Sequence, residues 1–153
     1  MPFPHKQVLI TGATSGIGLA LTERLLANNI CVIAVARSTA RLEALLAKHG
    51  PAHLAIEPLD VTDLASLPDW TARITATYPA PGRDAVRVVE IVPPAVQTEL
   101  HTRQGLAPIG MPLGDFIDEM WVALESGEQD EILVGPAKEH AHIDDAKRHS
   151  SSS

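Results

Sequence analysis

The stretch Thr11-Gly12-Ala13-Thr14-Ser15-Gly16-Ile17-Gly18 decides the fold of this chain. It follows the apolar run Val8-Leu9-Ile10 and opens a helical pattern that continues to Asn29. A helix N-terminus exposes N–H groups without intrahelical partners and the positive end of the helix dipole, so a strand, a glycine turn and a helix start in succession form a phosphate cradle. We therefore expect a pyrophosphate-binding turn here.

The three glycines of this stretch have separate expected roles. Gly12 allows the tight turn, Gly16 removes a Cβ that would block the phosphates, and Gly18 lets the helix pack onto the sheet. Their spacing, Gly-x-x-x-Gly-x-Gly, differs from the common GxGxxG fingerprint. It resembles the TGxxxGIG signature of the short-chain dehydrogenase/reductase family. A glycine loop without a ligand is the alternative, and the flanking strand and helix and the matches downstream disfavour it.

Composition limits the class of protein. The chain has 153 residues, enough for one domain, and its 45% hydrophobic and 20% charged content predicts a soluble globular protein. A net charge of −7 with scattered basic residues disfavours nucleic acid or an anionic membrane as a partner. We expect no membrane span and no secretory leader. The single cysteine, Cys31, lies in an apolar run and predicts a structural thiol in a reducing compartment, the cytoplasm; a reactive thiol is the alternative.

The N-terminal half alternates between strand and helix patterns. The expected strands are residues 8–11, 30–36 and 53–59, and the expected helices are 17–29, 39–49 and 68–77. Ser38 or Thr39 supplies the cap of the second helix, and Gly50-Pro51 ends it. This order predicts a Rossmann-like α/β fold, with parallel strands joined by right-handed crossovers and helices on both faces of the sheet.

The pattern changes after residue 77. Val86–Val92 is expected to be a fourth strand, residues 101–112 a mobile loop, Leu113–Leu124 a helix and Glu131–Val134 a last strand. Residues 1–135 then form a single nucleotide-binding domain. Residues 136–153 are polar and end in four serines, which predicts a disordered tail.

The resemblance to the family implies NADP(H) as cofactor. Family members that bind NAD usually carry an acidic residue where the second strand ends, to hold the ribose 2′-hydroxyl. This chain has Ala36 and Arg37 there, and a cation suits the 2′-phosphate of NADP(H). An ordinary exposed arginine is the alternative interpretation of Arg37.

Two further segments resemble the family. Asp60 and Val61 follow the third strand, where the family contacts adenine through the Asp carboxylate and the next backbone group; a helix cap is the alternative. Pro93–Thr98 resembles the family's P-G-x-V-x-T segment, with Pro94 in place of glycine. The resemblance implies that its valine backbone meets the nicotinamide carboxamide and that its threonine hydroxyl meets either the amide or a phosphate. The expected cofactor-binding residues are Gly12, Ser15, Gly16, Ile17, Gly18, Arg37, Ser38, Asp60, Val61, Val96 and Thr98.

The family's catalytic Asn, Ser, Tyr and Lys have no match in this chain. They would lie between the third helix and the fourth strand, an interval reduced here to Tyr78–Ala85. Tyr78 is the only tyrosine, and Gly82 stands where the paired lysine belongs. The interval lacks serine, and the only asparagines are Asn28 and Asn29. We therefore expect no catalytic residues of the family's type in this chain.

Other polar residues are possible substitutes, and we interpret both groups as solvated. The first group, near the expected nicotinamide end, is Asp84, Glu99, His101 and Arg103. The second, a set of metal-ligand types in the tail, is His140, His142, Asp144, Asp145 and His149. Because a tail offers no preorganised scaffold, we expect no metal site.

The short interval also affects the sheet. We expect Val86–Val92 to pair beside Val8–Thr11, which gives one five-stranded sheet in the order 3-2-1-4-5 and brings Val96 and Thr98 close to the glycine turn. An unpaired first strand would otherwise promote association. The helices that the family commonly uses for dimer contacts are missing, so the family's usual oligomer cannot be assumed for this chain. We expect stability below the usual ~5–15 kcal/mol.

These inferences combine into one functional hypothesis. The resemblance implies an oxidoreductase by descent, with NADP(H)-dependent redox of a carbonyl or alcohol, in which the cofactor-binding elements are kept and the catalytic residues are absent. The alternatives are a non-catalytic NADP(H)-binding or interaction protein and an inactive fragment.

Overall fold

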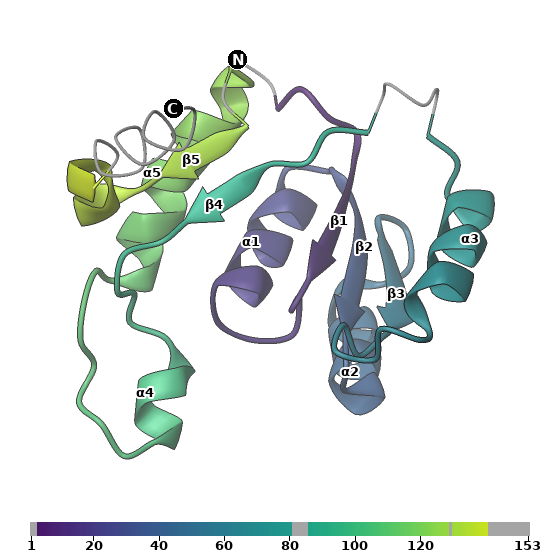
Figure 1. The fold of residues 1–153 in the computed structure, drawn as a ribbon, viewed down its shortest axis with the longest axis horizontal. Helices are drawn as coiled ribbons and strands as arrows, with labels where there is room; N and C mark the ends of the chain where they lie inside the picture. Colours follow the sequence, from purple (N-terminus) through teal and green to yellow (C-terminus); the bar gives the residue numbers. More distant parts are fainter. Residues whose placement is uncertain (1–2, 81–85, 129, 141–153) are drawn as a thin grey trace, which may run out of the picture. The chain divides into compact units, whose positions relative to one another are not determined.

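The computed structural model describes all residues except 1–2, 81–85, 129 and 141–153 (Figure 1). The chain forms two compact units. We call residues 7–14 and 22–88 the first unit, and residues 1–6, 15–21 and 89–153 the second unit.

The first unit contains a parallel three-stranded sheet. Its strands are β1 (Gln7–Thr11), β2 (Cys31–Ala36) and β3 (Leu54–Pro58), with β2 in the centre. All β2 residues after Cys31 are buried, because an inner parallel strand is covered on both faces and therefore needs an apolar run. The three strands and their parallel direction are as predicted.

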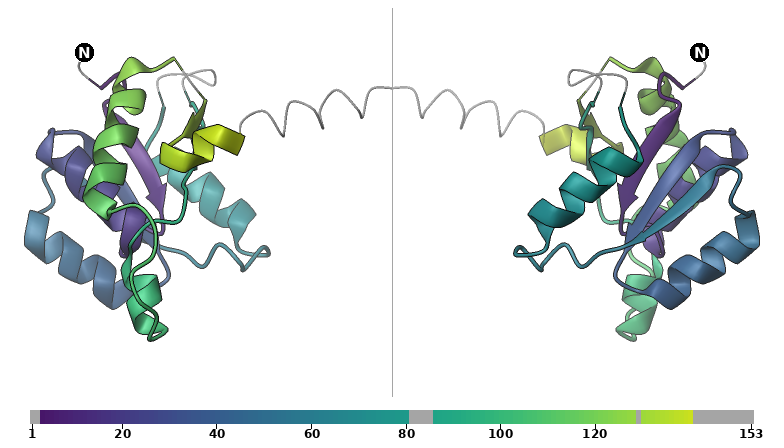
Figure 2. Two further views of the ribbon diagram at one scale, coloured as in Figure 1. Left: turned by 90° about the vertical axis from the view of Figure 1, so that its left-hand side faces the viewer. Right: turned by 90° about the vertical axis from the view of Figure 1, so that its right-hand side faces the viewer.

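Helices α2 (Thr39–His49) and α3 (Leu67–Thr77) follow β2 and β3, and Figure 2 shows them from two sides. Ser38 is the residue that caps α2: its Oγ accepts a hydrogen bond from the Arg41 N–H at 3.4 Å. Such a cap satisfies one of the donors that the first turn leaves without a partner. Leu42 and Leu45 form the buried face of the helix, as their spacing requires.

A polar cluster joins α3 to β3. The buried carboxylate of Glu57 accepts a hydrogen bond from the Arg73 guanidinium at 2.8 Å and another from the Tyr78 hydroxyl at 3.1 Å. A buried carboxylate is tolerated when it is both paired and hydrogen-bonded. These two bonds therefore fix the end of α3 to the sheet, and they give the only tyrosine of the chain a structural role.

We expect the Tyr78 phenol to titrate above its ordinary pKa of 10.0, because burial and the hydrogen bond to the Glu57 carboxylate both raise the pKa. A raised pKa in the folded state contributes stability that is fully present below pH 10.0 and is lost as pH rises through the folded value. With one tyrosine in the chain, phenolate absorbance reports this group alone. Tyr78→Phe should flatten the alkaline decline in unfolding free energy, whereas a phenol midpoint at or below 10.0 would contradict the expectation.

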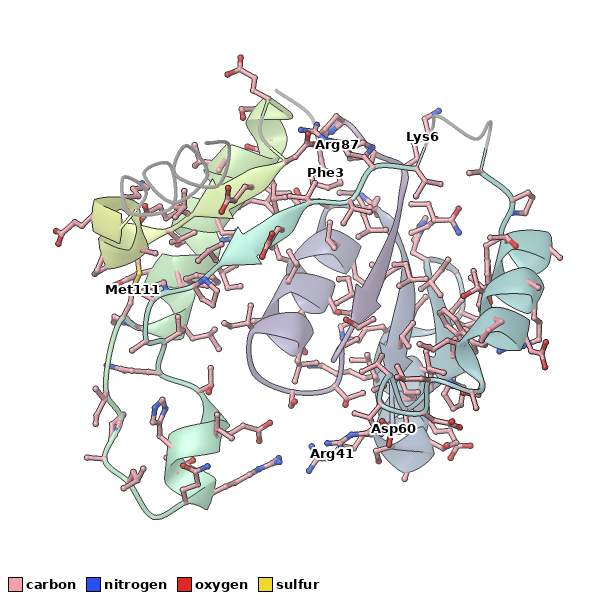
Figure 3. The ribbon with its side chains drawn as sticks, in the orientation of Figure 1. Phe3, Lys6, Arg41, Asp60, Arg87 and Met111 are labelled. Atoms are coloured by element: carbon pink, nitrogen blue, oxygen red, sulfur yellow. The ribbon has the colours of Figure 1, made fainter. Side chains whose placement is uncertain are left out.

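The second unit contains a parallel pair of short strands, β4 (Glu90–Val92) and β5 (Glu131–Leu133). Its helices are α4 (Glu99–Arg103), α5 (Leu113–Ser126) and the 3-10 helix η2 (Gly135–His140). The apolar face of α5 supplies the core of the unit through Phe116, Ile117, Met120 and Trp121. The ring of Phe3, labelled in Figure 3, stacks on Trp121 with a centroid distance of 5.5 Å.

The prediction of one continuous five-stranded sheet is wrong. The five strands form a three-stranded sheet in the predicted order 3-2-1 and a separate two-stranded sheet. The predicted pairing of β4 with β5 is confirmed, and the predicted pairing of β4 with β1 is not formed. Only the last three residues of the predicted strand Val86–Val92 are in strand geometry, and Val86 and Val88 are exposed. A three-residue strand offers few ladder bonds, and those that β4 makes within the described residues go to β5.

Two further predictions need correction. Residues 101–112 are not wholly loop, because α4 begins at Glu99 and continues to Arg103, where an i,i+4 ion pair joins these two side chains at 2.7 Å. Disorder from residue 136 is wrong for its first five residues, which lie in η2 with Ala137 buried. The rest of the predicted tail, residues 141–153, lies outside the described residues.

Candidate functional site

The glycine turn lies between β1 and α1 (Gly16–Ala27). Gly12 and Gly16 have φ values of 68° and 52°, in the left-handed region that residues with a Cβ avoid. The buried Ala13 ties the turn to the sheet, because its N–H donates to the Val35 carbonyl at 3.2 Å. The helix ladder starts where the Leu19 N–H donates to the Ser15 carbonyl. Strand, turn and helix start are therefore arranged as the sequence predicts.

Within the second unit, Thr98 lies beside Gly16. A Cβ built on Gly16 would be 3.6 Å from both Cβ and Cγ2 of Thr98, which is ordinary van der Waals contact. The predicted proximity of Thr98 to the glycine turn is thus observed, although the strand pairing proposed to produce it is not. Thr98 precedes α4 with extended backbone, and its side chain makes no capping hydrogen bond.

A short backbone ladder holds the segment that carries Val96 and Thr98. The Met111 N–H donates to the Ala95 carbonyl at 2.8 Å, and the Gln97 N–H donates to the Met111 carbonyl at 2.9 Å. The Gln97 amide also donates to the Gly110 carbonyl at 2.9 Å. Val96 is buried between these bonds. The ladder closes the base of a loop over residues 98–109, and Figure 3 labels Met111 at this base.

Asp60 and Val61 follow β3 in the first unit. The Leu59 N–H donates to the Ala36 carbonyl at 3.0 Å, which places this segment at the end of β2. Oδ1 of Asp60 accepts two hydrogen bonds from Thr62, one from its hydroxyl at 2.7 Å and one from its N–H at 3.0 Å. These two bonds, with the positive charge of Arg37, lower the pKa of Asp60. The carboxylate is therefore charged and held in one orientation.

Arg37 and Ser38 occupy the turn between β2 and α2, and Arg37 is exposed. Arg41, in the first turn of α2, is a further exposed cation at this end of the unit. Figure 3 shows Arg41 and Asp60 at the end where β2 and β3 terminate. The sequence analysis did not include Arg41 among the expected cofactor-binding residues. Its position in the first helical turn, three residues after the cap Ser38 and four after Arg37, could have indicated a second cation at this end of the sheet.

The residues present suit a dinucleotide phosphate. Gly12 leaves open space, because a Cβ there would meet nothing within 4 Å. The first turn of α1, which includes Gly16, Ile17 and Gly18, contains no acidic residue that would repel an anion. Ser15 precedes this turn, and its hydroxyl-bearing side chain is half-buried. An anion at this helix start would gain backbone N–H donors and the favourable end of the dipole.

Three of the possible substitute residues lie in α4, where Nδ1 of His101 is buried without a hydrogen-bond partner among the described residues. Tyr78 donates to Glu57 in the first unit, and Glu99 and Arg103 pair with each other. Asp84 and the tail residues from His142 onward lie outside the described residues, as does the side chain of His140. Where residues are described, no group of three metal-ligating side chains is present.

The fold and the glycine turn define an α/β protein of the dinucleotide-binding, Rossmann-like class. A search of protein families matches residues 6–81 to short chain dehydrogenase. The rat 3-keto-steroid reductase/17-beta-hydroxysteroid dehydrogenase 7 is 46% identical over 69 residues, which is 41% of this chain and 21% of that protein. The family match covers about half of the chain, and it places that N-terminal part in the short-chain dehydrogenase/reductase family. The chain matches about a fifth of the length of this relative.

Solved structures share the fold over most of the chain. The bulky-bulky ketone specific alcohol dehydrogenase from Comamonas testosteroni has a TM-score of 0.68 at 14% identity, covering 96% of this chain and 94% of that one. A short-chain dehydrogenase from Sphingobium yanoikuyae in complex with NADPH has a TM-score of 0.65 at 18% identity, covering 95% of each chain. Within the described ranges, no helix is long and apolar enough to cross a membrane.

Proposed function

We propose that this chain binds NADP(H), with the pyrophosphate at the glycine turn. The observation that carries the proposal is the turn itself, in which two left-handed glycines lead into a helix start without acidic residues and Thr98 lies beside Gly16. A bound nicotinamide dinucleotide supplies or accepts a hydride. The chain's own residues supply the binding and the orientation.

The expected contacts divide along the cofactor. Arg37 and Arg41, with the cap at Ser38, favour a 2′-phosphate, because guanidinium groups form strong charge-assisted hydrogen bonds to phosphate. The charged Asp60 suits the exocyclic amine of adenine, and the backbone of Val61 suits the ring edge. The Thr98 hydroxyl and the Val96 backbone suit the nicotinamide amide. The NADPH held by the Sphingobium yanoikuyae enzyme agrees with the choice of NADP(H).

We propose that these residues bind the cofactor and that the family's proton transfer is not carried by this chain. Redox of a carbonyl or alcohol requires an acid or base at the reacting oxygen. The sequence contains no Tyr-x-x-x-Lys, and the hydroxyl of Tyr78 is engaged by Glu57. A longer protein that includes such a segment would be an NADP(H)-dependent reductase; this chain alone would be a cofactor-binding protein. Its single free cysteine agrees with a cytoplasmic location.

A binding experiment with a glycine variant tests this proposal. NADPH should bind the wild-type protein, and Gly16→Ala should weaken binding by at least about tenfold by obstructing phosphate approach. The added methyl meets Thr98 only in ordinary contact, so the fold can hold its volume. Gly50→Ala is the matched control, because its φ of 75° brings comparable strain at the end of α2. Titration calorimetry should show normal binding for this control.

Other results of the same titration would contradict the proposed binding of NADP(H) or favour one of the two alternative functions. Equal NADPH affinity of the wild type and Gly16→Ala would show that the pyrophosphate does not bind at the glycine turn. A folded protein that ignores NADPH would support an interaction protein, and a protein that ignores NADPH and exposes apolar surface would support an inactive fragment.

A further inference from the structure

Near the expected binding site for the adenine of the cofactor, Thr62 donates two hydrogen bonds to the carboxylate of Asp60. No role has yet been assigned to this pair of bonds. Asp60 stands two residues beyond β3 and is exposed, so its carboxylate would rotate freely without a restraint. Thr62 restrains it with two donors, the hydroxyl at 2.7 Å and the N–H at 3.0 Å, and both bonds end on Oδ1. Two bonds to one oxygen fix the plane of the carboxylate and leave its second oxygen available.

The backbone supports this arrangement from both sides. The Asp63 N–H donates to the Asp60 carbonyl at 3.1 Å, which closes the turn around Thr62. The Leu59 N–H holds the preceding residue to Ala36, the neighbour of Arg37. Within the described part of the chain, Oδ2 of Asp60 has no hydrogen-bond partner. A charged acceptor in a fixed orientation is thus presented at the end of β2 and β3.

We propose that Thr62 is a positioning residue for adenine recognition: its hydroxyl holds Oδ1 of Asp60 so that Oδ2 faces the exocyclic amine of the cofactor. The inference rests on the proposed binding of NADP(H). An acceptor held in place loses less conformational freedom on binding than a freely rotating one, so its hydrogen bond contributes more to affinity. It also gives selectivity, because a carbonyl in place of the amine would meet a fixed negative charge.

The test uses NADPH and its hypoxanthine analogue, which carries an oxygen where adenine carries the amine. The wild type should bind NADPH about tenfold more tightly than the analogue, as expected for one hydrogen bond to a charged group. Thr62→Val keeps the shape and the N–H but removes the hydroxyl, and should reduce this ratio to about twofold. Thr62→Ser restores the hydroxyl and should restore the ratio, while Asp60→Asn should abolish it.

A pH profile separates positioning from a purely structural role. The Thr62 hydrogen bonds lower the pKa of Asp60, so the wild-type preference should persist as pH falls below the ordinary value of 3.8. Thr62→Val should lose its preference at a higher pH than the wild type does. If Thr62→Val does not fold, Thr62→Ala takes its place, and a binding ratio that this variant leaves unchanged would overturn the inference.

The outcomes separate the two proposals. NADPH binding with the same ratio in the wild type and Thr62→Val would overturn the role of Thr62 and leave the proposed function intact. Absence of NADPH binding by the wild type would overturn the proposed function, and the inference with it.

Discussion

Replacing Gly110 with alanine is expected to destabilise the second unit by about 3–4 kcal/mol, a large effect for one methyl group. Gly110 has a φ of 101°, which an L-residue with a side chain rarely adopts. A Cβ there would also lie 2.0 Å from the carbonyl oxygen of Ala95 and 2.4 Å from its carbonyl carbon. Both atoms belong to the backbone, so relief of the clash requires the ladder at Met111 and Gln97 to move.

Gly105→Ala provides the matched control in the same loop. Its φ of 69° brings a comparable backbone penalty, but a Cβ there would meet nothing within 4 Å. The control should cost about 1–2 kcal/mol, the strain of a left-handed residue alone. Urea unfolding followed by circular dichroism measures both variants. Equal losses would show that contact with Ala95 does not make Gly110 necessary.

The second large effect is expected at Arg37. Arg37→Gln should weaken NADPH binding by about thirtyfold, because a charge-assisted contact to the 2′-phosphate is lost. NADH has a hydroxyl at this position, so its affinity should change by less than about threefold. The ratio of the two dissociation constants, measured by nicotinamide fluorescence, therefore reports the phosphate contact itself.

Lys48→Gln controls for the change in net charge. Lys48 lies in the last turn of α2 and pairs with Glu23, away from the turn that carries Arg37. The control should leave the NADPH to NADH ratio unchanged at moderate ionic strength, because exposed charges are screened over about 10 Å. An equal loss of NADPH and NADH binding in Arg37→Gln would assign Arg37 to general stability instead of cofactor choice.

The sequence was sufficient to predict the three-stranded part of the fold. Its apolar runs and the glycine turn have short-range causes: buried parallel strands need apolar residues on both faces, and a left-handed turn needs glycine. Ser38 shows the limit of such local inference. The sequence offered two possible caps, and only the hydrogen bond to the Arg41 N–H identified the one that is used.

The separation of the strands into two sheets could not be predicted from local pattern. Val86–Val92 reads as an apolar strand, but strand residues form hydrogen bonds only where a partner backbone lies in register. The predicted order placed this segment between Val8–Thr11 and Glu131–Val134, and the structure pairs Glu90–Val92 only with Glu131–Leu133 among the described strands.

Sequence alone determined the family, the glycine turn, the alternating N-terminal half and the absence of a Tyr-x-x-x-Lys pair, because each is carried by residue identity and short spacing. Tertiary structure decided that β4 does not pair with β1 and that Tyr78 bonds to Glu57. It also decided that Thr62 holds Asp60 and that only glycine is compatible with position 110. These contacts depend on the positions of a few atoms from residues that are not specified by any local sequence pattern.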